Sequence, residues 1–550
     1  MTKTQANNFA VSRTGNALLA LLLIAGTLAC YANSLRGVFL LDDNALLRGE
    51  RHIKTLPSAV VATTRPLTRL TFFLNYTLWG FKPADTHAVN VGIHLTAGMC
   101  LYGILRRILM LPRFQTLFGR AAIPIAWTVA ALWLTHPLQT ASVTYVSQRA
   151  EALMGMFYLL TLYCLVRGAQ SSRHAWWEGG AVAACALGMA SKPVMVTAPV
   201  VALLFDRAFL AGSFREALRT RLRLYFGLAA TWLILGTLLA FPHESATSTG
   251  LQPHLPSPLT YLLTQPAVIV HYLRLAFWPN ALCLDYAWPP ATSIKATLIP
   301  ALILTSVFTL SVWVTIRNHP LGFAGLWFFV ILAPTSSFLP IGDCAFEHRM
   351  YLPLASVLTA VVTGSYWFLR GRVRPSLMIA LAGTAVVASC VTTFNRNELY
   401  GNEIWIWRDT VKKRPFNLRA RIDLAVALSE AGYAQEAVRE YQQVLMLIPA
   451  DLRSRLDAGK VVITGLLPPD AMEFHYFRAH VNLGLLTYRS FHRPREALIH
   501  LATALRVVPY REDVKEMVRF ILQHEPDATN ELPADIREVL CNELPNTRSK

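Results

Sequence analysis

Long apolar stretches recur through the first 395 residues, and they constrain the fold more than any other feature. A helix needs about 20 apolar residues to cross a bilayer. Hydrophobic residues make up 54% of the 550 residues and charged residues 15%, against roughly 45–50% and 25% in soluble domains. We therefore expect an all-α polytopic membrane protein with about eleven spans. The expected spans are 16–35, 88–105, 122–136, 151–166, 176–191, 193–206, 223–241, 295–315, 321–340, 351–369 and 376–394.

Basic residues set the expected orientation, because short loops rich in arginine and lysine stay in the cytoplasm. Such loops all fall on one side of the predicted bundle. They hold Arg106, Arg107, Arg113 and Arg120, then Arg167 and Arg173, then the segment 207–223, then Arg317, and then Arg370, Arg372 and Arg374. The net charge of +18 is therefore attributed largely to topology, and no basic run interleaved with aromatic residues indicates nucleic-acid binding.

The N-terminal apolar stretch and the cysteines carry little functional signal. "LLALLLIAGTLAC" ends at Cys30 like a lipoprotein cleavage site, but Thr27 departs from that pattern, so we expect an uncleaved first helix. A disulfide between Cys283 and Cys344 stays open, because both lie outside the spans. No CxxC motif or histidine cluster predicts a metal site. No cofactor is predicted, and a requirement for a divalent metal stays open.

Past residue 395 the sequence becomes charged and helix-forming, and a repeat appears. A tetratricopeptide repeat has two small residues and then a proline at regular spacing. The small residues let two helices pack closely, and the proline ends the second helix. This pattern occurs at Ala425, Ala437 and Pro449, and again at Gly484, Ala497 and Pro509. We expect a membrane domain over 1–395 and an extracytoplasmic repeat domain over 396–550, closed by a capping helix in "EDVKEMVRFILQH". The repeats predict a groove for a protein, with a structural lid as the alternative.

Polar residues gather in the segments that we expect on the outer face. Asp42 and Asp43 stand together after the first span. The same face receives Arg65, Arg69, His87, His94, His136, Arg149, Lys192, His271, Arg274, Glu347, His348 and Arg349. Ionisable groups at membrane depth are costly and indicate a site. A carboxylate there can accept the proton of an attacking hydroxyl, while cations stabilise a lipid phosphate as it leaves a sugar.

Structural interpretations of these residues stay open beside the functional one. Asp43 precedes a helix-like stretch and suits a helix N-cap. Arg149 and Arg349 taken singly suit snorkelling to head groups, and His94 and His136 taken singly suit packing. The clustering, rather than any single residue, favours a site.

Several motifs resemble the transmembrane and tetratricopeptide repeat O-mannosyltransferase family and its bacterial relatives, over nearly the whole chain. They are "FLLDDNALL", "RPLTRLTFFLNYTLWGFKPADTHAVNVGIHL", "THPLQTASVTYVSQRAEAL", "ASKPVMVTAPVVALLFD", "YLLTQPAVIVHYLRLAFWPNALCLDY", "APTSSFLPI" and "EHRMYLPLA". The resemblance implies a GT-C glycosyltransferase fold, in which the first outer loop carries a catalytic acidic pair. Two clear repeats are fewer than the animal proteins carry.

The resemblance implies roles for individual residues. Asp42 matches the catalytic base, with Asp43 as its neighbour or substitute, and an aspartate in second place leaves the assignment between them open. The candidates for the donor phosphate are Arg149, Lys192 and Arg349. The candidates for orienting groups or for the acceptor side are Glu347, His348, Arg65, His136 and Arg274.

The resulting functional hypothesis is a protein O-mannosyltransferase-like enzyme. It transfers one sugar, with inversion, from a polyprenyl-phosphate donor to a Ser or Thr hydroxyl of an extracytoplasmic protein held by the repeats. The alternatives are transfer to a lipid or surface glycan, and a non-enzymatic membrane scaffold or lipid-linked glycan transporter. A transporter is disfavoured because spans such as "ALILTSVFTLSVWVTI" and "AGLWFFVILAPTSSFL" carry no charge. The short repeat array favours a bacterial inner membrane over the endoplasmic reticulum.

Overall fold

The computed structural model describes residues 13–43, 55–56, 63–240, 255–317, 319–463, 471–530 and 532–544. The chain divides into two compact units. The first comprises Met1–Leu282 and Trp288–Asn402, and the second comprises Cys283–Ala287 and Glu403–Lys550. The regular elements of the described residues are all helices, with no β-strands. This confirms the predicted all-α class.

Eight segments of the first unit are long and apolar enough to cross a membrane, counted over the described residues. This composition confirms an integral membrane protein. The helices that form these segments are α2 (Arg13–Cys30), α7 (Pro83–Leu109), α8 (Pro112–Phe118) with α9 (Ala122–Thr135), α11 (Arg149–Ala169), α13 (Ala198–Asp206), α14 (Phe214–Ala240), α16 (Ile294–Ile316) and α19 (Pro375–Leu399).

Each of the eleven predicted spans corresponds to a helix, but three of these helices fall short of a full crossing. Two are the short apolar helices α17 (Leu321–Leu332) and α18 (Pro353–Leu369), and the third is α12 (His174–Met189), of 16 residues. No span is predicted between 241 and 295, but the structure has a helix there, α15 (Pro258–Phe277). Residues 241–254 of that segment lie outside the described residues.

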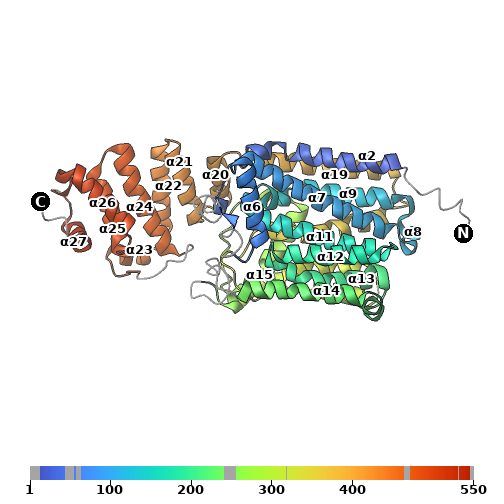
Figure 1. Cartoon of the computed structure of the whole chain (residues 1–550). Coiled ribbons are helices and arrows are strands. Elements are labelled where there is room, and N and C mark those ends of the chain that lie inside the picture. The colour runs from blue at the N-terminus through green and yellow to red at the C-terminus, as the bar shows by residue number, and fades with distance from the viewer. Residues whose placement is uncertain are drawn as a thin grey trace, which may run out of the picture. The chain divides into compact units, whose positions relative to one another are not determined.

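The long apolar helices of the first unit lie side by side and nearly parallel (Figure 1). α11 packs against both α7 and α12, and α7 packs against α9. In the most apolar window of α7 and of α11, 67% of the residues are buried, against 6% for α19. α7 and α11 therefore form the interior of the bundle, while α19 presents apolar side chains to lipid. Gly155 of α11 permits close packing, because a Cβ there would lie 2.4 Å from the ring of Tyr351.

Short helical turns gather at one end of the first unit. η4 (Pro137–Gln139), α10 (Thr140–Val143) and η5 (Val146–Gln148) connect α9 to α11. η6 (Pro193–Thr197) follows α12 and packs against α11, whereas η10 (Glu347–Met350) precedes α18 and packs against η4 and α10. The residues of these turns come from distant parts of the sequence and meet at the same end of the bundle.

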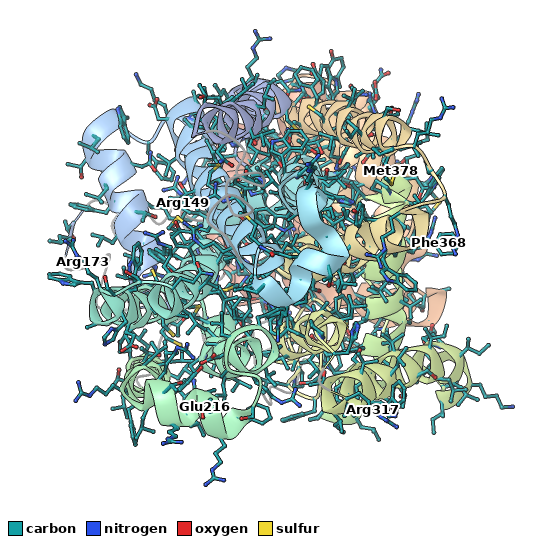
Figure 2. The ribbon with its side chains drawn as sticks, turned by 90° about the vertical axis from the view of Figure 1, so that its right-hand side faces the viewer. Arg149, Arg173, Glu216, Arg317, Phe368 and Met378 are labelled. Carbon is teal, nitrogen blue, oxygen red and sulfur yellow. The ribbon has the colours of Figure 1, made fainter. Side chains whose placement is uncertain are left out.

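The opposite end of the first unit carries the basic loops. Figure 2 looks onto this end, and Arg173, Glu216 and Arg317 point outward at its periphery, whereas Arg149 lies among the helices. Arg173 precedes α12 and Arg317 follows α16. The charged residues labelled in Figure 2 therefore fall into two groups: Arg173, Glu216 and Arg317 point outward, and Arg149 is enclosed by helices.

The second unit consists of antiparallel helix pairs where the sequence predicts repeats. Its helices are α20 (Glu403–Lys413), α21 (Leu418–Glu430), α22 (Ala434–Leu447), α23 (Ala450–Asp457), α24 (Met472–Phe491), α25 (Pro494–Val507), α26 (Glu512–His524) and α27 (Ala534–Glu543). α21 packs against α22, and α24 packs against α25. A Cβ at Gly484 would lie 2.8 Å from Leu501, which explains the small residue at this crossing. α26 covers the stretch that was predicted as the capping helix.

Candidate functional site

The acidic pair lies just after the first span, and its two members have different environments. Asp43 is buried, with 1% of its surface exposed, whereas Asp42 is exposed. Leu41 immediately before them has φ of 45°, which non-glycine residues seldom adopt. A backbone of this kind persists only where the surrounding contacts hold it. Residues 44–50, which would show whether Asp43 caps a helix, lie outside the described residues.

The carboxylate of Asp43 accepts hydrogen bonds from two segments. The backbone amide of Ser147 donates to Oδ1 at 2.6 Å, and the Ser147 hydroxyl donates to the same oxygen. The amide of Leu40 donates to Oδ2 at 3.1 Å. One residue earlier, the amide of Asp42 donates to the Tyr145 hydroxyl at 3.2 Å. The acidic pair is thereby attached to the turn that precedes α11.

Burial raises the pKa of Asp43 to about 7. The bonds from Ser147 and Leu40 favour the carboxylate and oppose this rise, and the charge of Asp42 adds to it. Burial also raises the pKa of the Tyr145 hydroxyl well above its usual value, and the charges of Asp42 and Asp43 act in the same direction. A carboxyl group with a strongly shifted pKa beside a second acid is typical of a functional site.

Arg149 is fully buried and surrounded by neutral acceptors. Its Nε donates to Asn90 at 2.7 Å, and its Nη1 donates to Asn75 at 2.6 Å and to the Thr71 carbonyl at 3.2 Å. Its Nη2 donates to the Thr86 carbonyl at 3.0 Å, and its guanidinium carbon lies 4.2 Å from the Phe72 ring centroid. These contacts join α11 to α6 (Pro66–Trp79) and to the first turns of α7. Arg149 therefore acts as an internal brace in this structure.

Lys192 forms a buried ion pair with Glu151, at 2.6 Å between Nζ and Oε2. The two side chains are exposed by 9% and 4%. Lys192 precedes η6 and Glu151 lies in the first turn of α11. Glu151 is not among the predicted site residues, although an acid inside an apolar span two residues after Arg149 is a usable signal.

Arg65 lies beside this ion pair because the start of α6 is attached to the end of α12. The amide of Leu67 donates to the Ala190 carbonyl at 3.1 Å, and the Thr68 hydroxyl donates to the Ser191 carbonyl at 3.0 Å. Arg65 is exposed as a residue, and its guanidinium interacts electrostatically with Glu151 and with Asp42. Arg65 is thus the cation that connects the acidic pair to the Lys192–Glu151 pair.

η10 contributes a histidine to the same cationic cluster. His348 is buried and stacks on Phe346, with ring centroids 5.1 Å apart. Its pKa lies well below the usual value, first because of burial and then because of the positive charges of Lys192, Arg349 and Arg65. The structure therefore places a neutral imidazole within the field of three cations.

Arg349 is engaged by protein acceptors like Arg149. Its Nη1 donates to the Cys344 carbonyl at 2.9 Å and to the Thr335 carbonyl at 3.1 Å, and its Nη2 donates to the Asp343 carbonyl at 2.5 Å. Nη1 also lies 3.2 Å from the Tyr261 hydroxyl. Glu347, its neighbour in η10, is buried.

His136 and Arg274 have contacts of their own. His136 is buried; its Nδ1 accepts the Leu138 amide at 3.2 Å and its Nε2 lies 3.1 Å from the Ala276 carbonyl, which is a local capping and packing role. Burial lowers the pKa of His136 to about 4. Arg274, in the last turn of α15, donates to Asn280 at 3.1 Å and is exposed.

Clusters of metal ligands and disulfides are both absent from the described residues. They contain no group of three or more His, Cys, Asp or Glu side chains placed to hold a metal ion. All eight cysteines lie within the described residues, and no disulfide joins any of them. Cys283 and Cys344 are therefore both thiols in this structure.

The fold and the site together define a class: an integral membrane protein with an acidic pair and a cationic cluster at one end of its helical bundle. Comparison with known proteins narrows this class. The family described as dolichyl-phosphate-mannose-protein mannosyltransferase matches residues 90–240, which include Arg149, Glu151 and Lys192. No solved structure matches.

Curated relatives match over longer stretches. Protein O-mannosyl-transferase F38B6.6 of Caenorhabditis elegans is 24% identical over 460 residues, which cover 78% of this chain and 63% of that protein. Human protein O-mannosyl-transferase TMTC1 is 23% identical over 507 residues, which cover 78% and 55%. Drosophila melanogaster protein O-mannosyl-transferase Tmtc2 is 29% identical over 250 residues, which cover 42% and 25%. The matches span 63% or less of these relatives' lengths.

These matches confirm the resemblance seen in the motifs. The chain is a relative of the transmembrane and tetratricopeptide repeat (TMTC) family of protein O-mannosyltransferases.

Proposed function

We propose that this protein is a membrane glycosyltransferase that moves one sugar from a polyprenyl-phosphate donor to a Ser or Thr hydroxyl of a protein on the extracytoplasmic side. The observation that carries the proposal is the position of Asp42, an exposed carboxylate that interacts with Arg65 at the edge of a cationic cluster. The names of the relatives support the reaction class.

Asp42 is the proposed general base. Its side chain is exposed, so an acceptor hydroxyl can reach it, whereas the carboxylate of Asp43 is buried and bonded to Ser147 and Leu40. A base must lie within hydrogen-bonding reach of the proton that it removes. Asp43 is the proposed positioning residue, because it holds the loop that presents Asp42.

Lys192, Arg65 and His348 are proposed to receive the donor phosphate. An ammonium group has three donors, and Glu151 accepts from one of those on Lys192. Arg65 is exposed and can turn toward an anion. Positive groups fixed where negative charge develops lower the barrier of the transfer, because the phosphate gains charge as the sugar leaves.

Arg149 and Arg349 are proposed as positioning residues rather than phosphate ligands. The guanidinium groups of both are directed at carbonyl, hydroxyl and amide oxygens of the protein. Contact with a phosphate would require them to give up these buried hydrogen bonds, each of which costs about 1.5–3 kcal/mol when a charged group is involved. Their contacts instead fix α6 and η10, the elements that carry Arg65 and His348.

The test is the intact mass of extracytoplasmic proteins from cells that lack the gene. The cells are complemented with wild type, Asp42→Asn or Asp85→Asn, and each chain is first shown to be inserted and folded. Asp85 lies in the first turn of α7 and provides an Asp to Asn control outside the cluster. We expect a hexose-sized mass increment with wild type and Asp85→Asn only.

Other outcomes would contradict parts of this proposal. An increment that returns with Asp42→Asn removes Asp42 from catalysis. An increment that appears on a lipid or surface glycan, with none on protein, replaces the protein acceptor. If wild type changes the mass of neither, the non-enzymatic scaffold or transporter hypothesis takes precedence.

A further inference from the structure

A large apolar cavity lies in the first unit, away from the acidic pair. Its volume is about 360 Å³, within the range of about 300–1,000 Å³ that is usual for small-molecule pockets. Its walls come from the last turns of α7, from α8, from η7 (Arg207–Ala211), from the start of α17 and from α18. α8 lies at the opposite end of the first unit from α6 (Figure 1).

The cavity and the candidate site lie near opposite ends of α7. Asn90, which bonds to Arg149, lies near the start of α7, and Leu109 in the cavity wall is its last residue. Leu109 follows Asn90 by 19 positions, which correspond to about 28 Å at 1.5 Å per residue. The cavity therefore lies near the other surface of the bilayer, whose hydrocarbon core is about 30 Å thick.

Most polar groups in the wall have partners within the protein; Nε1 of Trp327 is buried without one. The hydroxyls of Ser356, Thr359 and Thr363 each donate to a carbonyl of their own helix, at 2.7, 2.7 and 2.6 Å. Nδ1 of His319 accepts the Leu321 amide at 3.3 Å. Ordered water needs two to four polar partners, and an empty apolar cavity takes up apolar ligands. The occupant that suits this cavity is therefore a hydrocarbon chain.

Two arginines border the cavity. The guanidinium carbon of Arg113 lies 4.6 Å from the ring centroid of Phe114 and 6.0 Å from that of Phe209, and both rings line the wall. Arg370 donates at 2.6 Å to the carbonyl of Leu117, another lining residue. Neither arginine forms an ion pair with a residue that the structure describes. An anionic group beside the cavity would be complementary to these charges.

We propose that the cavity binds one acyl chain of an anionic glycerophospholipid, whose phosphate contacts Arg113 and Arg370. The lipid is taken from the leaflet that surrounds this end of the bundle and links α8 to the end of α18. It stabilises the packing of these elements and takes no part in the sugar transfer at the opposite end.

Gly364 allows the cavity to be filled without a clash. It lies in the cavity wall on α18, and a Cβ there would meet no atom within 4 Å. Gly364→Leu therefore places a side chain where the acyl chain would lie. Gly383→Leu is the matched control, because Gly383 also lies in an apolar helix with open space around it but outside the cavity wall. Arg113→Gln and Arg370→Gln remove the charges, and Arg173→Gln, an exposed arginine at the same end of the bundle, is their control (Figure 2).

The experiment measures thermal unfolding of the delipidated full chain in mild detergent, with added phosphatidylglycerol or phosphatidylcholine. We expect phosphatidylglycerol to raise the Tm of wild type and of both controls more than phosphatidylcholine does, and to have no effect on Gly364→Leu. We expect Arg113→Gln and Arg370→Gln each to weaken the response to phosphatidylglycerol about fivefold in lipid concentration, as for one basic side chain at an anionic membrane surface.

Native mass spectrometry of the chain purified from cells identifies the bound species. We expect one glycerophospholipid mass on wild type and none on Gly364→Leu. Equal Tm responses to the two lipids, a Gly364→Leu variant that responds like wild type, or an adduct with the mass of a polyprenyl phosphate would each overturn the proposal.

Discussion

Ser147 donates two hydrogen bonds to Oδ1 of Asp43, one from its backbone amide at 2.6 Å and one from its hydroxyl. These bonds tie the chain after the first span to the turn before α11, across more than one hundred residues of sequence. Tyr145, beside the same turn, accepts the amide of Asp42, so both acids are attached to this part of the chain. The two aspartates therefore have separate roles: one anchors the loop and the other faces outward.

Ser147→Ala should loosen this anchor. Above about pH 7, where the Asp43 carboxylate is charged, the loss of one hydrogen bond to it costs about 1.5–3 kcal/mol, so the Tm of the full chain should fall. Ser356→Ala is the control, because its hydroxyl bonds only to the Pro353 carbonyl in its own helix. We expect that control to lower the Tm less. Equal changes for both variants would show that the hydroxyl of Ser147 adds nothing to the anchor.

Asp43 should make stability depend on pH in the direction opposite to a salt-bridged acid. Burial raises its pKa to about 7, whereas an unfolded Asp has a pKa of about 3.9. Between these values the folded chain binds the proton that the unfolded chain has released. The stability contributed by Asp43 is therefore lost as the pH rises from about 4 to about 7, by up to about 4 kcal/mol.

The comparison of wild type with Asp43→Asn measures this effect. Thermal unfolding of both chains at several pH values between 5 and 8 should show wild type losing stability relative to the variant as the pH rises. A difference that stays constant with pH, or that changes in the opposite direction, would show that the pKa of Asp43 is not raised.

Replacing only one partner of the buried Lys192–Glu151 ion pair should destabilise the fold. Glu151→Gln and Lys192→Met each leave a buried charge without its partner, which destabilises proteins by about 3–5 kcal/mol. The double variant should recover much of this loss in a thermal unfolding measurement. Glu151→Gln should be the more harmful single change, because Glu151 also interacts with Arg65. If the double variant is as unstable as the sum of the two single variants, the pair has no coupling.

A second buried ion pair should stabilise the second unit. Arg419 contacts both carboxylate oxygens of Asp285, at 2.7 and 2.8 Å, and Asn417 donates to the Asp285 carbonyl at 3.2 Å. Burial opposes ionisation of Asp285, but the charge of Arg419 and the hydrogen bonds from Arg419, Asn417 and the Ala287 amide together keep the pKa below its usual value. We expect Arg419→Met to destabilise the unit by about 3–5 kcal/mol and to increase hydrogen exchange at Cys283–Ala287.

Arg408→Met is the matched control for that variant. Arg408 pairs with Glu436 at 2.9 Å, but both side chains are at least half exposed. Exposed pairs contribute about 0–1 kcal/mol. A loss of stability as large as that of Arg419→Met would contradict the assignment of the effect to burial.

Much of the helical bundle follows from hydrophobic stretches in the sequence, since every predicted span lies on a helix. α15 was missed because Gln265, Pro266 and Arg274 interrupt its apolar pattern. α17 is shorter than predicted because the chain around 333–346 leaves the helix before reaching η10. Length and apolarity predict that a segment is helical, but they do not fix where turns at the membrane surface begin.

The sequence predicts which residue types occur in the candidate site better than it predicts the contacts that these residues make. Adjacent acids and enclosed cations were visible in the sequence, but the different burial of Asp42 and Asp43 depends on Ser147, distant in the chain. Arg149 and Lys192 look equivalent as isolated basic residues. Only the fold shows that amide oxygens surround the first while a carboxylate pairs with the second, because these partners come from other helices.

The most direct test of the central claim is sugar transfer by the purified full chain, with a polyprenyl-phosphate sugar as donor and a Ser- or Thr-containing peptide as acceptor. Asp42→Asn should lower kcat by about 100-fold or more, the contribution of a general base, without changing the Tm. Asp85→Asn should leave the rate unchanged. Transfer by Asp42→Asn at the wild-type rate would contradict the account, because the exposed acid of the pair would then have no part in the chemistry.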